Sequence, residues 1–351
     1  MADLTKDTSR TRLVVTFFDR AKADLKDSPA ALWLNPFNQL LKSLAPSFGF
    51  DSNDSNGYQA SFPGPGVAQL HYTTHPTLPL DCSKLQKDPV VAQFEAEKGV
   101  EIIFDCHPCP TTGTEPSQRP LKLALFDMDS TLINEEVIDE LARSIGLTAA
   151  VSAITARAMN GDIDFATSLK ERVAMLKGVP STVWEDLKKT VTIAEGAREL
   201  IAGLKRRGVL TGVVSGGFMP MAQWLKGELG LDVAVANHLV EEGPTEELPF
   251  PHLSGALNAE YPIVTPELKR DTLLSLAAAH SIKIYETVAV GDGSNDLLML
   301  RTAGLGIAWK AKPKVQIAAP MRLNGQSLAE LLYLFGPEES GKLSEGLMLA
   351  R

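Results

Sequence analysis

The sequence predicts an α/β protein built on a parallel β-sheet that is covered by helices and preceded by a smaller α+β unit. Three short apolar runs are each followed by a polar turn and then a helical pattern: residues 121–126, 209–214 and 285–290. Strands that alternate with helices in this way form parallel sheets with helices on both faces. The 351 residues also exceed the length of about 250–300 residues at which one core usually divides.

The first strand, residues 121–126 (LKLALF), ends abruptly in DMDST at residues 127–131. Its apolar run is typical of a strand buried on both faces. Asp127 and Asp129 are therefore two carboxylates at the end of a buried strand, an arrangement that is costly unless something neutralises them. An ordinary strand-to-helix turn with an Asp cap is the alternative explanation.

Polar turns also follow the second and third strands, SGGF at residues 215–218 and GDGSND at residues 291–296. In a parallel sheet all three turns lie at one edge, where open α/β sheets bind ligands. Together they contribute Asp127, Asp129 and Asp292, which repel one another unless a hard divalent cation lies between them. Oxygen ligands of this kind suit Mg²⁺.

The second turn predicts an anion site beside that cation. Ser215 offers a hydroxyl, and Gly216 and Gly217 offer free backbone N–H groups at the start of a helix. A cation next to an anion cradle, with a carboxylate between them, describes phosphoryl transfer through an aspartyl intermediate.

The N-terminal part has the order β-α-(β)-β-α-β, which fits a ferredoxin-like α+β unit. The predicted strands and helices occupy residues 12–18, 35–44, 58–62, 67–73, 88–98 and 100–105. Residues 107–120 are rich in Pro, Thr and Ser and form the expected linker, so the predicted domains are 1–118 and 119–351.

Inside the second domain, residues 135–195 contain only helical patterns and interrupt the alternation directly after the first strand. We expect this insertion to be a helical cap, or lid, over the strand ends. Residues 238–263 have no regular pattern and are expected to be irregular, and a helix is expected over residues 266–280.

Cys82, Cys106 and Cys109 are the only cysteines, too few for a disulfide scaffold at this length. Cys106 and Cys109 form a CxxC, which suggests a redox pair or part of a zinc site. A redox CxxC opens a helix, whereas Pro110 and a loop follow here, and no second CxxC supplies further ligands. The sequence therefore favours neither function.

The overall charge and hydropathy exclude several classes of partner. A net charge of −9 argues against a general nucleic-acid or anionic-membrane partner. No run approaches the roughly 18 apolar residues of a membrane helix, and the polar N-terminus does not resemble a secretory signal. A cytoplasmic protein is expected.

The motifs DMDST, SGGF and GDGSNDLLM resemble those of the haloacid dehalogenase (HAD) superfamily and, within it, of the phosphoserine phosphatases, over about residues 120–335. The resemblance implies a HAD-like Rossmannoid sheet and Mg²⁺-dependent hydrolysis of O-phospho-L-serine to L-serine, the last step of serine biosynthesis. Asp127 would be the nucleophile and Asp129 the general acid and base. The Asp127 carboxylate, the Asp129 backbone carbonyl and Asp292 would hold the metal.

The same resemblance implies phosphate-binding residues: Ser215, Gly216, Lys269 and Asn295, with Asp296 in support. The lysine lies in the helix before the third strand, where Arg270 is the neighbouring alternative. Without a role in the site, Lys269 would be a solvated charge on the helix surface. Asp296 would be an acid in the first turn of a helix, where it interacts favourably with the helix dipole.

Substrate choice is expected in the lid. Phosphoserine needs an acid for its ammonium group and an arginine for its carboxylate, and the resemblance assigns these roles to Glu136 and Arg172. Glu135 and Lys170 are the alternatives from sequence alone. Met159 and Phe165 match apolar wall positions of the pocket, although a Met and a Phe at such spacing are more often core residues.

Two other functions remain open at this point. A related enzyme could act on phosphothreonine or a sugar phosphate, although a neutral sugar needs neither an acid nor an arginine. Alternatively, an ACT-like N-terminal unit could sense an amino acid while the phosphatase half is inert, which the complete set of motifs argues against. The N-terminal unit itself could bind an amino-acid effector, mediate a homodimer or only stabilise the fold.

Overall fold

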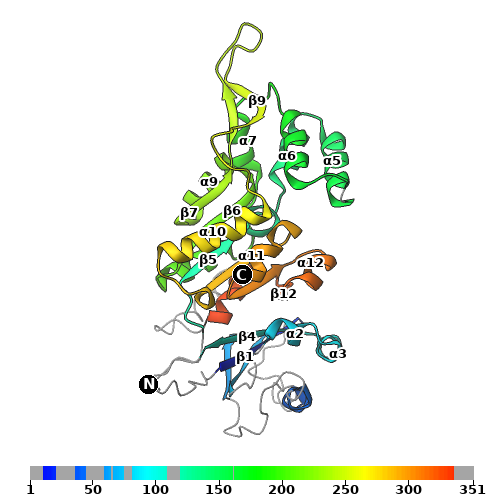
Figure 1. The fold of residues 1–351 in the computed structure, drawn as a ribbon, viewed down its shortest axis with the longest axis vertical. Helices are drawn as coiled ribbons and strands as arrows, with labels where there is room; N and C mark the ends of the chain where they lie inside the picture. Colours follow the sequence, from blue (N-terminus) through cyan, green and yellow to red (C-terminus); the bar gives the residue numbers. More distant parts are fainter. Residues whose placement is uncertain are drawn as a thin grey trace, which may run out of the picture.

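The computed structural model describes residues 11–20, 36–44, 59–64, 66–74, 81–108, 119–160 and 162–335. Figure 1 shows these residues in three tiers along the long axis, with an N-terminal sheet at the bottom, the main sheet in the middle and a helical lid at the top.

The main sheet has six strands in the order β12-β11-β10-β5-β6-β7, and each neighbouring pair is parallel, as predicted. Its strands are β5 (Leu123–Phe126), β6 (Leu210–Phe218), β7 (Val233–Asn237), β10 (Thr287–Gly291), β11 (Leu305–Trp309) and β12 (Met321–Leu323). All four residues of the central strand β5 are buried, which explains its continuous apolar sequence.

Helices cover both faces of this sheet: α8 (Ala197–Arg206), α9 (Met219–Leu229), α10 (Pro266–Ala279), α11 (Leu297–Thr302), α12 (Pro313–Ala318) and the 3-10 helix η4 (Leu328–Phe335). Side chains of β5 alternate between two apolar clusters. Leu123 and Leu125 pack with α10 and α11, whereas Ala124 and Phe126 belong to the cluster that contains α8, α9 and η4. Within the described ranges, no helix combines the length and apolarity needed to cross a bilayer.

The lid consists of four helices between β5 and β6: α4 (Val137–Ser144), α5 (Thr148–Asn160), α6 (Phe165–Ala174) and α7 (Val183–Thr190). They occupy the insertion in which only helices were expected. Figure 1 shows α5, α6 and α7 above the edge of the sheet at which β5 and β6 end.

The expectation that residues 238–263 are irregular is wrong. They contain an antiparallel hairpin of β8 (Leu239–Glu242) and β9 (His252–Leu257). The hairpin is held by the lid, since Gly178 N–H donates to the Leu253 carbonyl and Leu253 N–H to the Val179 carbonyl, both at 2.8 Å. These partners are distant in sequence, so local pattern gave no sign of the strands.

The N-terminal unit is a four-stranded antiparallel sheet in the order β2-β3-β1-β4. It comprises β1 (Thr11–Asp19), a helix over residues 36–44, β2 (Gln59–Gly64), β3 (Val67–Thr74), α2 (Cys82–Gln86), α3 (Pro89–Lys98) and β4 (Val100–Pro108). Helix α2 was not predicted. Strand β4 runs three residues beyond the predicted one, so the CxxC begins inside a strand and the predicted linker starts later.

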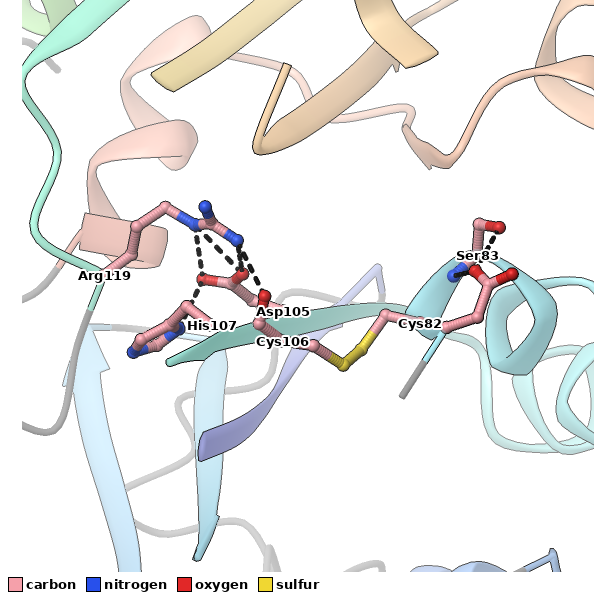
Figure 2. Close-up of a disulfide and its surroundings, with 7 residues drawn as sticks. Cys82, Ser83, Asp105, Cys106, His107 and Arg119 are labelled. Atoms are coloured by element: carbon pink, nitrogen blue, oxygen red, sulfur yellow. Dashed lines mark hydrogen bonds and ion pairs between the residues drawn. A yellow bond between two sulfur atoms is a disulfide. The ribbon is translucent and has the colours of Figure 1, made fainter. Parts of the chain in front are cut away.

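A disulfide joins Cys82, at the start of α2, to Cys106 in β4 (Figure 2). It was not predicted, because the two residues are 24 positions apart and come together only where α2 packs against β4 in the fold. The other cysteine of the CxxC, Cys109, lies outside the described residues.

The N-terminal sheet packs against the edge of the main sheet. The Gln69 side chain donates to the Tyr333 carbonyl of η4 at 2.8 Å. Arg119, near the end of the predicted linker, forms an ion pair with the buried Asp105 of β4 (Figure 2). It also donates to the Tyr285 carbonyl. A single apolar cluster extends from β1 and β4 through η4 to β5, so the two sheets share part of their core.

Candidate active site

The site begins at the carboxyl end of β5. Asp127 N–H donates to the Val290 carbonyl of β10 at 2.9 Å, and its Oδ1 accepts a bond from Met128 N–H at 2.7 Å. The turn then passes through Ser130, whose φ of 53° lies in the left-handed region. Ile133 N–H then donates to the Met128 carbonyl at 3.1 Å, which closes the turn before the chain enters the lid.

Lys269 reaches Asp127 from helix α10, which is capped by Thr265. Its Nζ lies 2.8 Å from Asp127 Oδ1 and 2.7 Å from Asp296 Oδ1, and the side chain is fully buried. Burial alone would lower the pKa of Lys269, but the two carboxylates more than reverse this and raise it. The alternative residue, Arg270, is at the surface and pairs with Asp271, so the structure brings Lys269 and not Arg270 to the site.

Three carboxylates converge beside that lysine. Oxygen atoms of Asp127, Asp292 and Asp296 lie within 4.8 Å of one another. Burial, followed by the charge of Asp127, raises the pKa of Asp292 to about 8 and that of Asp296 to about 7. A buried cluster of carboxylate oxygens that resist ionisation is a donor set that suits a hard divalent cation. Asp296, predicted as a supporting residue, is thus as close to the cluster as Asp292.

Asp129 lies next to this cluster, although its carboxylate is not one of the three. Its Oδ1 is buried and has no hydrogen-bond partner among the described residues. Burial, and then the charges of Glu136 and Asp127, raise its pKa well above the ordinary value for Asp. A carboxyl group that holds its proton near neutral pH is suited to act as an acid.

The SGGF turn differs in one respect from its prediction. Ser215 is fully buried, and its Oγ accepts a bond from Gly217 N–H at 2.8 Å, so this N–H is not free. Gly217 is closely packed, because a Cβ there would lie 3.1 Å from Asp129 Oδ2 and 2.9 Å from Met128 Cε.

Asn237 holds this turn in place and was not predicted. Its Nδ2 donates to the Gly216 carbonyl at 2.8 Å and the Gly217 carbonyl at 3.2 Å, and its Oδ1 accepts from Val264 N–H at 2.9 Å. It therefore links the turn to the segment that leads into α10 and Lys269. A buried Asn at the end of a strand was the sequence signal, but its partners are apparent only in the fold.

From the lid, Glu136 and Arg172 face the same cluster. The Glu136 carboxylate accepts a bond from Ser130 Oγ at 2.8 Å. Its pKa is raised because nearby protein atoms displace water from the charged form, and then because of the charge of Asp127. Burial lowers the pKa of Arg172, whereas the charges of Asp139, Glu136 and Asp129 oppose this effect. The guanidinium thus lies in the field of the site's carboxylates.

The two alternative lid residues lie elsewhere. Glu135 accepts bonds from the backbone and hydroxyl of Thr192 at the base of the lid, at 2.9 and 2.7 Å, and Lys170 is exposed. The lid is close to the SGGF turn, since a Cβ on Gly216 would lie 3.0 Å from Phe165 Cζ and 3.9 Å from Asn295 Nδ2.

Phe165 and Asn295 therefore border the same space. The Met159 side chain lies outside the described part of the chain.

Comparison with known proteins agrees with this geometry. The family model described as haloacid dehalogenase-like hydrolase matches residues 121–304. A Schizosaccharomyces pombe protein named probable phosphoserine phosphatase is 43% identical over 235 residues, which cover 67% of this chain and 76% of that protein.

Two solved structures extend the likeness. A HAD-family hydrolase from Salmonella enterica subsp. enterica serovar Typhi matches 93% of this chain and 99% of its own, with a TM-score of 0.70 at 26% identity. A substrate-bound phosphoserine phosphatase complex matches 62% of this chain and 99% of its own, with a TM-score of 0.55 at 40% identity. The chain therefore belongs to the haloacid dehalogenase-like hydrolases.

Proposed function

We propose that this protein hydrolyses O-phospho-L-serine to L-serine and phosphate through an aspartyl-phosphate intermediate. The observation that carries the proposal is the convergence of Lys269, Asp127 and the acidic cluster beneath a lid that presents both a carboxylate and a guanidinium. Relatives that are 41–43% identical and named phosphoserine phosphatases support it.

Asp127 is the proposed nucleophile. A carboxylate oxygen attacks phosphorus while the bond to the serine oxygen breaks, and Asp129 gives its proton to that oxygen. Asp129, now ionised, then takes a proton from water as the water oxygen attacks phosphorus, which releases phosphate and restores Asp127. The raised pKa of Asp129 suits the first of these proton transfers, and the Lys269 charge stabilises the negative charge at the centre.

The metal is proposed to be Mg²⁺, held by the Asp127 carboxylate, the Asp129 backbone carbonyl and Asp292. When bound, it supplies charge neutralisation and orientation of the phosphoryl group. Asp296 supports this site by fixing Lys269 at 2.7 Å and by accepting a bond from Gly293 N–H at 2.9 Å. Ser215, Gly216, Lys269 and Asn295 are proposed to bind the phosphate.

Specificity is proposed to come from the lid. Glu136 would pair with the substrate ammonium group and Arg172 with its carboxylate, and Phe165 and Met159 would form the apolar wall. A sugar phosphate carries neither of these charges, so burying both lid residues against it would leave them unpaired. This favours an amino-acid phosphate as the substrate.

For the N-terminal unit, residues 1–118, we propose an accessory role beside the phosphatase domain, residues 119–351. Its strand order β2-β3-β1-β4 with antiparallel pairing supports a ferredoxin-like fold and an ACT-like assignment. A homodimer through this unit and an amino-acid effector are part of this proposal.

A phosphate-release assay over a panel of phosphorylated metabolites, with and without Mg²⁺, tests the function. Phosphoserine should be hydrolysed far faster than phosphothreonine, aryl phosphate or sugar phosphates, and only with the metal. A sugar phosphate as the best substrate would overturn the proposed substrate while leaving the phosphatase chemistry in place.

A further inference from the structure

The lid is joined to the main sheet by two segments, residues 132–136 and 191–196, which we call the lid hinge. They pair as a short ladder. Asn134 N–H donates to the Thr192 carbonyl at 3.0 Å, and Ala194 N–H donates to the Leu132 carbonyl at 2.9 Å. Since Glu136 ends the first segment, any shift of the hinge moves a proposed substrate ligand.

A third segment, residues 324–330, is seated against the hinge; we call it the clamp. Leu328 N–H donates to the Glu195 carbonyl at 2.8 Å. Gly196 has a φ of +77°, and a Cβ there would lie 2.0 Å from Ser327 Oγ and 2.6 Å from Ala329 N. The fit is therefore close, and displacement of the clamp removes support from the returning half of the hinge.

The Glu330 carboxylate makes two kinds of contact in the clamp. Glu330 Oε1 accepts a bond from Gln326 N–H at 2.9 Å, which fixes the clamp's own backbone. Glu330 Oε2 accepts a bond from Arg20 Nη1, also at 2.9 Å, and Arg20 is the residue directly after β1 of the N-terminal sheet. The Glu330 side chain thus links the clamp to Arg20 of the N-terminal unit.

Glu101 of β4 closes this network. It accepts a bond from Arg20 Nε at 2.6 Å and from Asn324 N–H, at the start of the clamp, at 3.0 Å. The side chains of Arg20, Glu101 and Glu330 are only 28%, 13% and 20% exposed. They are shielded from bulk water more than ordinary surface pairs, whose contribution is small. In Figure 1 the red η4 segment, which begins within the clamp, lies between β4 and the main sheet.

We propose that the clamp couples the N-terminal unit to the lid, with Glu330 as the positioning residue and the Arg20–Glu330 pair as the link. When Arg20 holds Glu330, the clamp supports the hinge and Glu136 and Arg172 keep their places over the acidic cluster. When the pair is broken, the hinge opens more often. Displacement of the N-terminal sheet would therefore alter substrate affinity without touching the reacting groups. The kinetic part of this proposal rests on the proposed function, whereas the mechanical part does not.

The test uses the full chain carrying Arg20→Met, Glu330→Gln or both, with Glu95→Gln as the matched control. Glu95 pairs with Arg322 across the same contact between the two sheets, and none of its bonds among the described residues reaches the clamp. Amide hydrogen exchange, measured without substrate, should rise by at least about fivefold in residues 132–136, 191–196 and 324–330 for both single variants. The double variant should add little, because the two changes break one link. Glu95→Gln should leave hinge exchange unchanged.

Kinetics supply the second readout. Arg20→Met and Glu330→Gln should raise KM for phosphoserine by at least about fivefold with a much smaller change in kcat, and Arg20→Lys, which keeps the charge, should restore part of the loss. Unchanged hinge exchange in both single variants, or an equal rise in Glu95→Gln, would overturn the coupling. If phosphoserine is not hydrolysed but hinge exchange responds as described, the coupling stands and only the substrate assignment fails.

Discussion

Lys269 Nζ lies 2.8 Å from Asp127 Oδ1, and neither side chain is more than 5% exposed. The same ammonium group lies 2.7 Å from Asp296. One buried cation therefore compensates two carboxylates of a cluster that contains a third, Asp292. This shared pairing explains how so many acids are tolerated at the end of one buried strand.

Lys269→Met should remove both this compensation and the proposed contact with phosphate. Leaving buried carboxylates unpaired costs about 3–5 kcal/mol, so the free energy of unfolding measured in urea should fall by that order and phosphate release should be lost. Arg270→Met, one residue further on the exposed side of α10, is the control and should change neither. Wild-type turnover by Lys269→Met would contradict the proposed role.

Asp127→Asn should abolish turnover, because an amide cannot form the aspartyl-phosphate. Phosphate release should drop by at least about 10⁴-fold, while the melting temperature should stay near that of the wild type, since the cluster loses one of three repelling charges. Phosphate release and thermal unfolding measured on the same sample separate the two effects. Near-normal rates would end the nucleophile assignment.

Arg172→Ala should separate binding from chemistry. Loss of a charged partner for the substrate carboxylate should reduce kcat/KM for phosphoserine by about 10–100-fold and have a much smaller effect on an uncharged aryl phosphate. Lys170→Ala, on the exposed side of the same helix, is the matched control. Equal losses on both substrates would show that Arg172 does not hold the carboxylate.

Asp292→Asn should make the melting temperature nearly independent of Mg²⁺. In wild-type protein, saturating Mg²⁺ should raise the melting temperature, because a ligand that binds only the folded state stabilises it. In EDTA the variant should melt at a higher temperature than the wild type, since Asn replaces a carboxyl group whose pKa the folded state raises to about 8. The variant should also lose most of the increase in melting temperature that Mg²⁺ causes. An undiminished Mg²⁺ response would place the metal elsewhere.

Acid stability should depend on Asp105. Burial alone would raise the pKa of this carboxyl, but Arg119 and then His107 overcome it and hold the pKa well below the ordinary value. Because the pKa is depressed in the folded state, the stabilisation is complete above the unfolded pKa of about 3.9 and is lost as the pH falls below that value.

Urea unfolding between pH 7 and about pH 2 measures this effect. Asp105→Asn should cost about 3–5 kcal/mol at pH 7, because Arg119 stays buried without its partner, and should flatten the acid limb of the profile. Asp186→Asn, at an exposed pair with Lys189, should leave the profile unchanged. An unaltered acid limb in Asp105→Asn would contradict the prediction.

Much of the main sheet could be predicted because its signals are local. The apolar runs of β5 and β10 are fully buried strands, and parallel pairing brings their polar turns to one edge whatever the intervening sequence. For this reason the proximity of Asp127 and Asp292 followed from their positions directly after those strands, whereas Lys269 was assigned through the resemblance to the HAD superfamily. The choice between Lys269 and Arg270 required the fold, since only helix orientation decides which side chain points inward.

Other features depend on contacts between distant segments and left no local trace. The β8–β9 hairpin forms against the loop between α6 and α7, and Asn237 acquires its role from carbonyls 20 and 21 residues away. The Gly217 N–H is taken by Ser215 because the turn stays extended within β6 rather than opening directly into a helix. Such pairings are fixed by tertiary structure and not by propensity.

The disulfide between Cys82 and Cys106 reduces the number of free thiols in the molecule. The chain has three cysteines, so the bond leaves Cys109 as the sole thiol. An alkylating dye should therefore label each non-reduced chain once and each reduced, denatured chain three times, and covalent pairing of two chains through sulfur could occur only at that position.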